Sequence, residues 1–502
     1  MADEGRVNTN RWEKWWPDPL GDPMWVDDPA LLWTYDEISD AINGSWLADL
    51  DEGQPITGAG YQFGQIRPGD LLFEQNTAQW LKKRREHSAG AYFKRGASAL
   101  ITANDRHLPD AGMNIMRVPN SRTAVLELGQ YARDRLAGTV VGVTGTAGKS
   151  TTKEMLRVML GHENPTVASR GNFNHSQGLA ISLAQTPPSI EYAIYELGVG
   201  NPKHTQGRVD MLKPHVAMIT DIFYDHLKYY KRIEDYADQK SMIFETVQVG
   251  GVAVLNRDGE FFDRLNANRR DHGNPRLLTF GKHPEADLRV VDCELEASRS
   301  TFMVSDGASV VDCEINVPGQ HMVTNALGAL ALVCACGLDW KHYSSYLPEF
   351  RPLFQRTEWH DIKLNISESF VFIDDCFNAN SGSMQAGLNL LMQLQVDRPA
   401  KQIIILGDML GLGRFSKKQH EALLPFVLKQ SNCCIYLFGD EMLHLYRKLP
   451  ENRKDVVYCQ HFAEMENDIL DSVSNGDLVY FKASDPDDIY MPFIARLKDL
   501  SR

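Results

Sequence analysis

The chain has 502 residues, a length that accommodates two to four domains, each large enough to bury its own core. Its composition, 43% hydrophobic and 24% charged, is that of an ordinary globular protein. The formal net charge of −14 excludes broad binding to nucleic acids, because neutralising phosphates requires clustered Lys and Arg. We interpret the one basic run, residues 82–85, as a solvated helix face.

The cysteines and the apolar runs indicate the cellular compartment in which the protein works. All eight cysteines lie at or after Cys293, and neither Cys334 with Cys336 nor the adjacent Cys433 and Cys434 has the spacing of a metal knuckle. Free thiols in a reducing compartment are the favoured interpretation. The sequence opens without a basic and apolar leader, and its apolar runs are too short to cross a bilayer. We therefore expect a cytoplasmic protein with no membrane insertion.

Residues 1–35 form an extension rich in Trp and Pro and without a clear period. Its tryptophans are Trp12, Trp15, Trp16, Trp25 and Trp33. So many aromatic residues are uncommon in a free tail, so we expect the extension to pack on a domain or a partner without a catalytic role. Residues 36–125 alternate helix-like and strand-like pieces, with strands expected near 70–73 and 97–102, which predicts a small N-terminal α/β domain.

A Gly-rich turn lies between a β-branched run, 139–143, and a stretch with helical spacing of apolar residues, 153–160. A strand, such a turn and a helix together cradle phosphate, with Lys149 reaching the terminal phosphates and the Ser150 hydroxyl placed to ligate Mg²⁺. Val143 stands where the general pattern has its first Gly, and taken alone the motif is also compatible with a chance turn. In this context it predicts a nucleotide site formed by Thr144, Gly145, Thr146, Ala147, Gly148, Lys149, Ser150 and Thr151.

Further strands are expected at 192–195, 216–220 and 252–256, within a central domain of residues 126–350. Ligands bind beyond the carboxyl ends of strands in open α/β sheets, so Glu196 and His226 fall where a nucleotide would lie. Near residue 350 the pattern changes to a linker. Strands expected at 370–375, 402–408, 434–439 and 478–481 then alternate with helices, which predicts a parallel sheet in a C-terminal domain of residues 351–502.

Six stretches, in order, resemble the signatures of the Mur ligase family, most closely its MurF type, which joins D-alanyl-D-alanine to a UDP-N-acetylmuramoyl tripeptide. They are residues 144–155, 171–174, 196–198, 225–227, 374–384 and 407–413. The resemblance implies a three-domain α/β architecture, in which residues 36–125 form the substrate-binding domain, followed by a central P-loop ATPase domain and a C-terminal Rossmann-like domain. It also implies that ATP and Mg²⁺ support formation of an amide bond through an acyl phosphate.

The resemblance assigns catalytic roles to Lys149, His226 and Lys240. It implies that Ser150 and Glu196 hold one Mg²⁺ and that His226 holds a second, together with Lys240, which aligns with a lysine that is carbamylated in this family. From the residues alone, interpretations without a metal role stay open. Glu196 could be a helix cap, His226 a buried histidine with its hydrogen bonds made within the protein, and Lys240 a solvated lysine.

The resemblance also implies contacts with the nucleotide. Asn325 matches an adenine-contacting asparagine, Arg356 the linker arginine near the phosphates, and Asp375 a ribose-binding carboxylate. Because these residues come from the central and the C-terminal domains, we expect the two domains to close over ATP around a hinge near residue 350.

Several positions depart from the family pattern, and all concern the acceptor side. Residues 62–64 read Gln-Phe-Gly where the family has Asp-Ser-Arg or Asp-Thr-Arg to grip the UDP end of its substrate. Residues 201–204 replace a His-Pro-Gly-Glu motif, Met322 replaces an Asn, and Cys376 replaces a Ser.

The leading hypothesis is a MurF-like ligase that joins a small-molecule carboxylate to the amine of an amino acid or a short peptide. One alternative is a true cell-wall ligase that acts on a UDP-linked muramoyl tripeptide. Another, from a different class, is a non-catalytic nucleotide-binding scaffold, against which the second-metal residues weigh. A ligase like folylpolyglutamate synthase is a third, which residues 153–155 and 375–384 disfavour. The sequence leaves the oligomeric state open.

Overall fold

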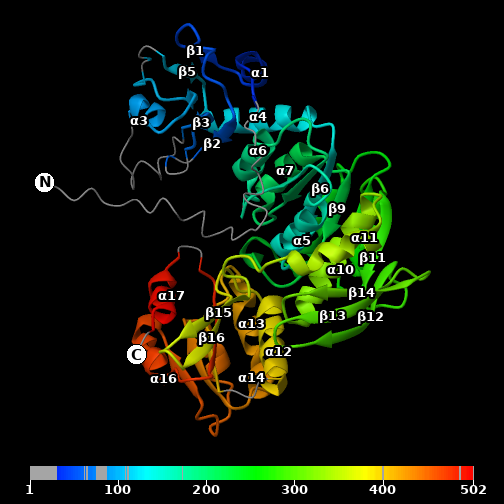
Figure 1. The fold of residues 1–502 in the computed structure, drawn as a ribbon, viewed down its shortest axis with the longest axis vertical. Coiled ribbons are helices and arrows are strands. Elements are labelled where there is room, and N and C mark those ends of the chain that lie inside the picture. Colours follow the sequence, from blue (N-terminus) through cyan, green and yellow to red (C-terminus); the bar gives the residue numbers. More distant parts are fainter. Residues whose placement is uncertain are drawn as a thin grey trace, which may run out of the picture.

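The computed structural model describes residues 31–61, 63, 66–74, 88–107, 109, 112–171, 173–397, 401–485 and 488–500. Three separate sheets follow one another along the chain, each with its own helices (Figure 1). The expected α/β class is confirmed. Within the described residues, no helix is both long enough and apolar enough to span a bilayer.

The first sheet has five strands in the order β1-β5-β4-β3-β2. Its strands are β1 (Ser45–Trp46), β2 (Gly58–Gly60), β3 (Asp70–Phe73), β4 (Ala99–Thr102) and β5 (Asn114–Arg117). Only β1 runs antiparallel to its neighbour. Every residue of β3 and β4 is buried, as expected for parallel strands covered on both faces. The helices around this sheet are α1 (Tyr35–Ala41), α3 (Ala89–Phe93) and α4 (Ser121–Asp134).

Trp33 connects this first sheet to the central part of the chain. Its side chain is fully buried, and its Nε1 donates a hydrogen bond to the carbonyl oxygen of Ala184 at 2.8 Å. The guanidinium group of Arg135 lies 3.4 Å from the centre of its ring, and the Tyr131 ring lies 6.1 Å away. The other four tryptophans of the extension lie outside the described residues. Trp33 is therefore part of a continuous core that spans two sheets.

Replacing Trp33 with alanine is expected to lower the free energy of unfolding by about 3–5 kcal/mol, because a large buried ring and its hydrogen bond are both lost. Urea unfolding followed by circular dichroism measures this loss. Trp46→Ala is the control, because Trp46 is only partly buried and donates to the Ser39 hydroxyl nearby. Equal losses in the two variants would show that Trp33 does not join the two parts of the core.

The central sheet has nine strands in the order β14-β13-β12-β11-β10-β9-β6-β8-β7. Strands β6 to β11 pair in parallel, β12 continues in parallel with β11, and β12, β13 and β14 pair antiparallel. The bounds are β6 (Thr139–Thr144), β7 (Thr166–Ala168), β8 (Tyr192–Glu196), β9 (Val216–Ile219), β10 (Val252–Asn256), β11 (Arg276–Gly281), β12 (Leu288–Leu295), β13 (Ser300–Ser305) and β14 (Val310–Ile315).

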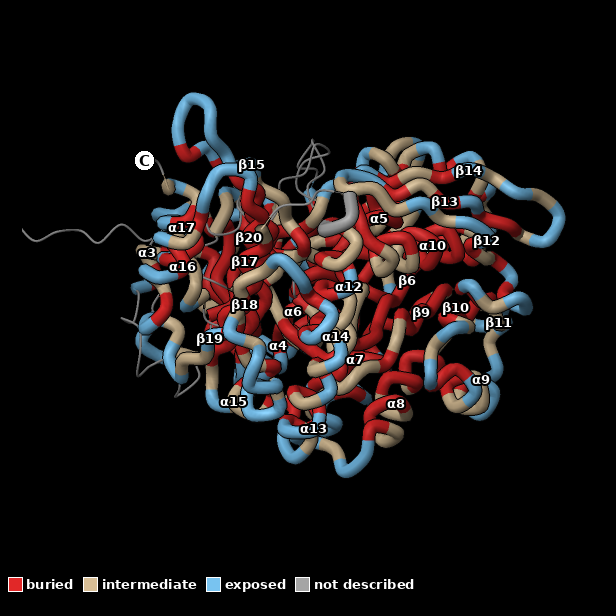
Figure 2. The backbone as a smooth tube through the Cα atoms, turned by 90° about the horizontal axis from the view of Figure 1, so that it is seen from below, coloured by how far each residue is buried: buried red, intermediate tan, exposed pale blue. Residues whose placement is uncertain are grey.

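Helices cover both faces of the central sheet. Side chains alternate between two cores along β9: Val216 and Met218 face the core under α5 (Lys149–Gly161) and α10 (Gln320–Ala335), and Ala217 and Ile219 face the other. The second core lies under α4, α6 (Ser176–Ala184), α7 (Thr205–Leu212), α8 (Ile233–Ser241) and α9 (Phe262–Asp271); the short α11 (Trp340–Tyr343) packs on α10. Figure 2 shows buried backbone along β6, β9 and β10, with exposed segments at the periphery.

The C-terminal sheet has six strands in the order β15-β16-β20-β17-β18-β19. The four predicted strands are confirmed as β16 (Ser369–Asp374), β17 (Gln402–Leu406), β18 (Cys433–Phe438) and β20 (Leu478–Lys482). Two others were not predicted: β15 (Glu358–Lys363), which is antiparallel to β16, and β19 (Val456–Cys459). The helices are α12 (Ser381–Asp397), α13 (Ser416–Glu421), α14 (Leu424–Leu428), α15 (Met442–Tyr446), α16 (Glu466–Ser472) and α17 (Met491–Lys498).

Candidate active site

The phosphate loop, residues 144–150, joins β6 to α5 as the sequence predicts. Gly145 and Gly148 have φ angles of +144° and +81°, a region that L side chains rarely adopt. A Cβ atom at Gly145 would overlap the Thr220 hydroxyl, and one at Gly148 would overlap the side chain of Asn325. Both positions therefore require glycine, and Asn325 lies directly against the loop.

Hydrogen bonds from the segment after β9 hold the loop in shape. The Thr220 hydroxyl donates to the carbonyl oxygen of Ala147 at 2.6 Å, and the Thr146 N–H donates to the carbonyl oxygen of Asp221 at 2.8 Å. Thr151 is buried in the first turn of α5. These hydrogen bonds hold the loop in shape without a ligand. A preformed anion site requires this property.

Lys149 is the first residue of α5, and its Nζ donates to the carbonyl oxygen of Thr146 at 3.0 Å. Burial lowers the pKa of Lys149, while the carboxylates of Glu196 and Asp225 act in the opposite direction. The amine therefore lies on the loop within the field of two carboxylates.

Glu196 ends β8 and is only 2% exposed. The Ser150 hydroxyl donates to its Oε2, and Asn174 Nδ2 donates to its Oε1 at 2.8 Å. Burial acts to raise the pKa of Glu196, but Lys149, Lys153 and other cations outweigh it and keep the pKa below the ordinary value. An ionised carboxylate beside a hydroxyl is a pair of hard oxygen ligands that suits Mg²⁺.

Lys240 lies on α8 and is 1% exposed, so the interpretation as a solvated lysine is wrong. Its Nζ donates to the carbonyl oxygen of Gly145 at 2.8 Å and lies 4.5 Å from the centre of the Tyr236 ring. Burial first, and then the charge of Lys149, lower the pKa of Lys240 well below the ordinary value; nearby carboxylates offset only part of this. The structure therefore places under the phosphate loop a buried amine whose charged form is disfavoured.

His226 follows β9 in the left-handed conformation, with φ of +53°. About half of its side chain, 51%, is exposed, so it is not a fully buried histidine. Its Nδ1 lies 3.9 Å from Asp225 Oδ1. Partial burial lowers the pKa of His226, Asp225 raises it, and Lys240 and Lys149 lower it further. The histidine and the two lysines therefore share one electrostatic environment.

The C-terminal part of the chain contacts this same segment. The Lys228 N–H donates to the carbonyl oxygen of Gly411 at 3.1 Å, and the Tyr224 N–H donates to the Ser381 hydroxyl at 3.3 Å. Residues that follow β9 of the central sheet therefore meet residues that follow β17 and begin α12.

Arg356 and Asp375 extend the site across this contact. The Arg356 guanidinium lies 4.0 Å from the centre of the Phe377 ring, and burial lowers its pKa while Glu196 and Asp375 raise it. Asp375 Oδ2 accepts a hydrogen bond from Lys482 Nζ at 2.7 Å. The sequence analysis missed Lys482, although a lysine that directly follows the apolar residues of a strand is a usable signal for a site at the carboxyl edge of a sheet.

Some positions named from the sequence lie outside the described residues, namely Gln62, Gly64, Asn172 and the basic run 82–85. Phe63, in the departing segment, is described. Its ring meets the edge of the Tyr92 ring at 5.2 Å, and the Arg95 guanidinium lies 4.4 Å from its centre. An arginine therefore stands beside the segment that lacks the arginine of the family pattern.

The fold and the site define a multidomain α/β protein with a phosphate loop in the central sheet. Arg356, which precedes the C-terminal sheet, interacts electrostatically with Glu196 beside the loop and with Asp375 at the end of β16. Two domains that meet at a phosphate loop are typical of an enzyme that encloses its nucleotide.

Comparison with known proteins identifies the family. Residues 143–333 match the model of the Mur ligase middle domain, and residues 355–485 match that of the Mur ligase glutamate ligase domain; together they make up more than half of the chain. A UDP-N-acetylmuramoyl-tripeptide–D-alanyl-D-alanine ligase from Rickettsia prowazekii is 29% identical over 390 residues, covering 78% of this chain and 85% of the relative.

Solved structures share the fold. A crystal structure of MurF from Acinetobacter baumannii matches 93% of this chain and 99% of its own, with a TM-score of 0.77 and 22% identity. A MurF ligase from Thermotoga maritima in complex with ADP matches 88% of this chain and 97% of its own, with a TM-score of 0.71 and 20% identity.

The chain belongs to the Mur ligase family. It is a MurF-like, ATP-dependent ligase that forms a peptide bond, and the predicted multidomain architecture is confirmed. The alternative of a non-catalytic scaffold is thereby set aside.

Proposed function

We propose that the chain joins the carboxylate of a UDP-linked muramoyl tripeptide to the amine of D-alanyl-D-alanine or a similar dipeptide. The observation that carries this proposal is the similarity to a relative named for this reaction, which extends over 85% of that relative. We propose further that residues 36–125 bind the carboxylate substrate, residues 126–350 bind ATP, and residues 351–502 receive the amine. Residues 1–35 stay an extension without a catalytic role in this proposal.

The nucleotide would bind with its phosphates on residues 144–151 and its adenosine toward Asn325 and Asp375. Two features of the loop support this assignment: its requirement for glycine at Gly145 and Gly148, and the close approach of Asn325 to Gly148. Arg356, whose charge acts on Glu196, would face the phosphates. In this proposal Lys482 holds the Asp375 carboxylate in place for the ribose hydroxyls through its 2.7 Å hydrogen bond.

The oxygen ligands at the loop fit Mg²⁺. Ser150 and Glu196 would hold one ion, and His226 with carbamylated Lys240 would hold a second. Bound Mg²⁺ neutralises phosphate charge during phosphoryl transfer. The hydrogen bond between Ser150 and Glu196 supports the first assignment, because it brings a hydroxyl oxygen and a carboxylate oxygen into direct contact in a buried place.

The chemistry requires activation because a carboxylate is a poor electrophile. In the proposed sequence a substrate carboxylate oxygen attacks the terminal phosphorus of ATP and ADP leaves, which gives an acyl phosphate. The amine then attacks the acyl carbon, loses a proton and displaces phosphate. Lys149, held on the loop, would stabilise the charge that develops on the transferring phosphoryl group.

The UDP end of the substrate needs a cation or a backbone nest in the first domain. We propose that Arg95 supplies the cation that residues 62–64 lack. Arg95 is exposed, and its guanidinium is held over the Phe63 ring at 4.4 Å, so it is positioned without losing access to a ligand.

The test is ADP release by the purified chain with ATP, Mg²⁺, UDP-N-acetylmuramoyl tripeptide and D-alanyl-D-alanine, together with mass spectrometry of the product. The expected result is a joined product that requires both substrates, and an increased KM for the UDP-linked substrate, with kcat retained, in Arg95→Gln. Binding of ATP without product would refute the proposed substrates and direct the search to other acids and amines.

A further inference from the structure

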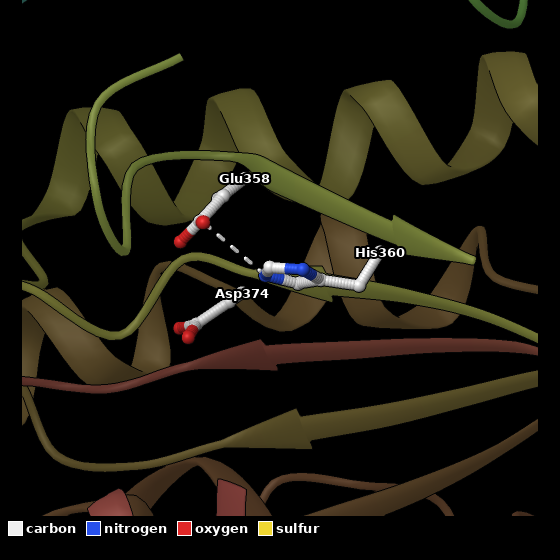
Figure 3. A group of neighbouring side chains, drawn as sticks. All are labelled: Glu358, His360 and Asp374. Carbon is white, nitrogen blue, oxygen red and sulfur yellow. Dashed lines mark ion pairs between the residues drawn. The ribbon is translucent and has the colours of Figure 1, made fainter. Parts of the chain in front are cut away.

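Three side chains that commonly bind metals lie together on β15 and β16, and the proposed ligase chemistry uses none of them. Glu358 and His360 are two residues apart on β15, so they share a face of the sheet, and Asp374 on β16 stands directly opposite Glu358. One ligand atom from each residue lies within 4.8 Å of the other two. Figure 3 shows the three side chains on the adjacent strands, with the His360 ring facing Glu358.

One oxygen of each carboxylate accepts a hydrogen bond from the protein. Glu358 Oε2 accepts the Gln355 N–H at 3.1 Å, while its Oε1 lies 3.5 Å from His360 Nε2. Asp374 Oδ1 accepts the thiol of Cys376 at 2.8 Å. Asp374 is fully buried, and its Oδ2 has no hydrogen-bond partner among the described residues.

The ring of His360 is held in place by stacking, and one of its nitrogens lacks a hydrogen bond to any described residue. It stacks on the Phe372 ring, with the ring centres 5.8 Å apart and the planes inclined by 24°. Its Nε2 is buried and makes no hydrogen bond within the described part of the chain, so its contact with a charged group there is the 3.5 Å ion pair with Glu358 Oε1. Donors on the outer oxygens and a stacked ring are the supports that orient ligands around a bound metal ion.

The protein itself satisfies this cluster only in part: His360 forms an ion pair with Glu358, and the charge of Lys498 acts on both carboxylates from farther away. Two carboxylates placed opposite each other on antiparallel strands repel, and burying a carboxylate oxygen without a donor is costly. A proton on Asp374 would satisfy that one oxygen, but His360 Nε2 would keep only its 3.5 Å ion pair with Glu358. A divalent ion would satisfy one atom of all three residues at once.

We propose that Glu358, His360 and Asp374 bind a divalent transition-metal ion of the zinc class. Two carboxylate oxygens and one imidazole nitrogen are ligands that Zn²⁺ takes, at about 2.0–2.2 Å. Ligand atoms bound to one such ion lie at most about 4.4 Å apart, so small side-chain rotations would bring the three atoms, now within 4.8 Å of one another, around a single ion. The ion ties β15, which directly follows the linker residues Gln355 and Thr357, to β16.

The experiment compares metal binding by the full chain and its variants, without nucleotide, after removal of metal by a chelator. Equilibrium dialysis with Zn²⁺ counts the bound ions, and Co²⁺ reports the coordination through its absorption spectrum. His444→Gln is the matched control, because His444 pairs with Glu441 at 3.8 Å in the same part of the chain but belongs to no three-residue cluster among the described residues.

The wild type and His444→Gln are expected to bind one more equivalent of Zn²⁺ than His360→Gln and Glu358→Gln. Zn²⁺ is also expected to raise the Tm of the first two more than that of the last two, because an ion that binds only the folded chain stabilises it. Circular dichroism confirms that each variant is folded. Equal numbers of bound ions in wild type and His360→Gln would overturn the proposal.

Discussion

Lys149→Ala is expected to nearly abolish ATP-dependent ligation, with a decrease in kcat of about 10³-fold, the upper end of the range for removing a group that stabilises transition-state charge. Lys149 Nζ is held on the phosphate loop by the carbonyl oxygen of Thr146. No other amine takes this place in the described residues: Lys153 donates to Ser169, and Lys240 donates to Gly145 on the loop. The loss is measured as ADP release with the substrates that support turnover.

The fold of Lys149→Ala should persist, because the substitution removes a desolvated amine and leaves the buried strands of the sheet intact. Its Tm is expected to stay close to that of the wild type. Lys448→Ala, at an exposed position on the C-terminal domain, is the control and should retain full turnover. An active Lys149→Ala enzyme would disprove the proposed mechanism.

Local patterns in the sequence were sufficient to predict most of the fold. Val216–Ile219 and Cys433–Phe438 are continuous apolar runs, as parallel strands covered on both faces require. β15 was not predicted because its residues, Glu358–Lys363, are largely polar and follow the linker without a turn signal. An edge strand needs to bury only part of its surface, so its sequence carries a weaker pattern.

The residues of the candidate site were also predictable from local sequence only in part. The phosphate loop and Glu196 follow from local sequence and from the position of strand ends. The roles of Lys240, Asn325, Arg356 and Asp375 came only from the family resemblance, because spacing along the chain does not bring these residues together. The pairing of Asp375 with Lys482 depends on the register of two strands more than 100 residues apart, which no local pattern encodes.

The state of Lys240 leads to the second prediction. A fully charged ammonium at this place would be buried beside Lys149, which is why its pKa is lowered so far. A neutral amine can attack CO₂ to form a carbamate and release a proton, which turns a buried cation into an anion. That anion would reverse the repulsion with Lys149 and supply oxygen ligands for Mg²⁺.

Lys240→Ala is therefore expected to lose about 10²–10³-fold in kcat, the cost of removing one group that stabilises charge in the transition state. The truncated side chain leaves room beneath the loop, so acetate or formate should enter and restore part of the activity, whereas chloride at the same ionic strength should not. Lys149→Ala should gain nothing from acetate, because an anion does not replace its positive charge. If acetate leaves Lys240→Ala inactive, the buried amine acts as a structural donor to Gly145 and the carbamate assignment is wrong.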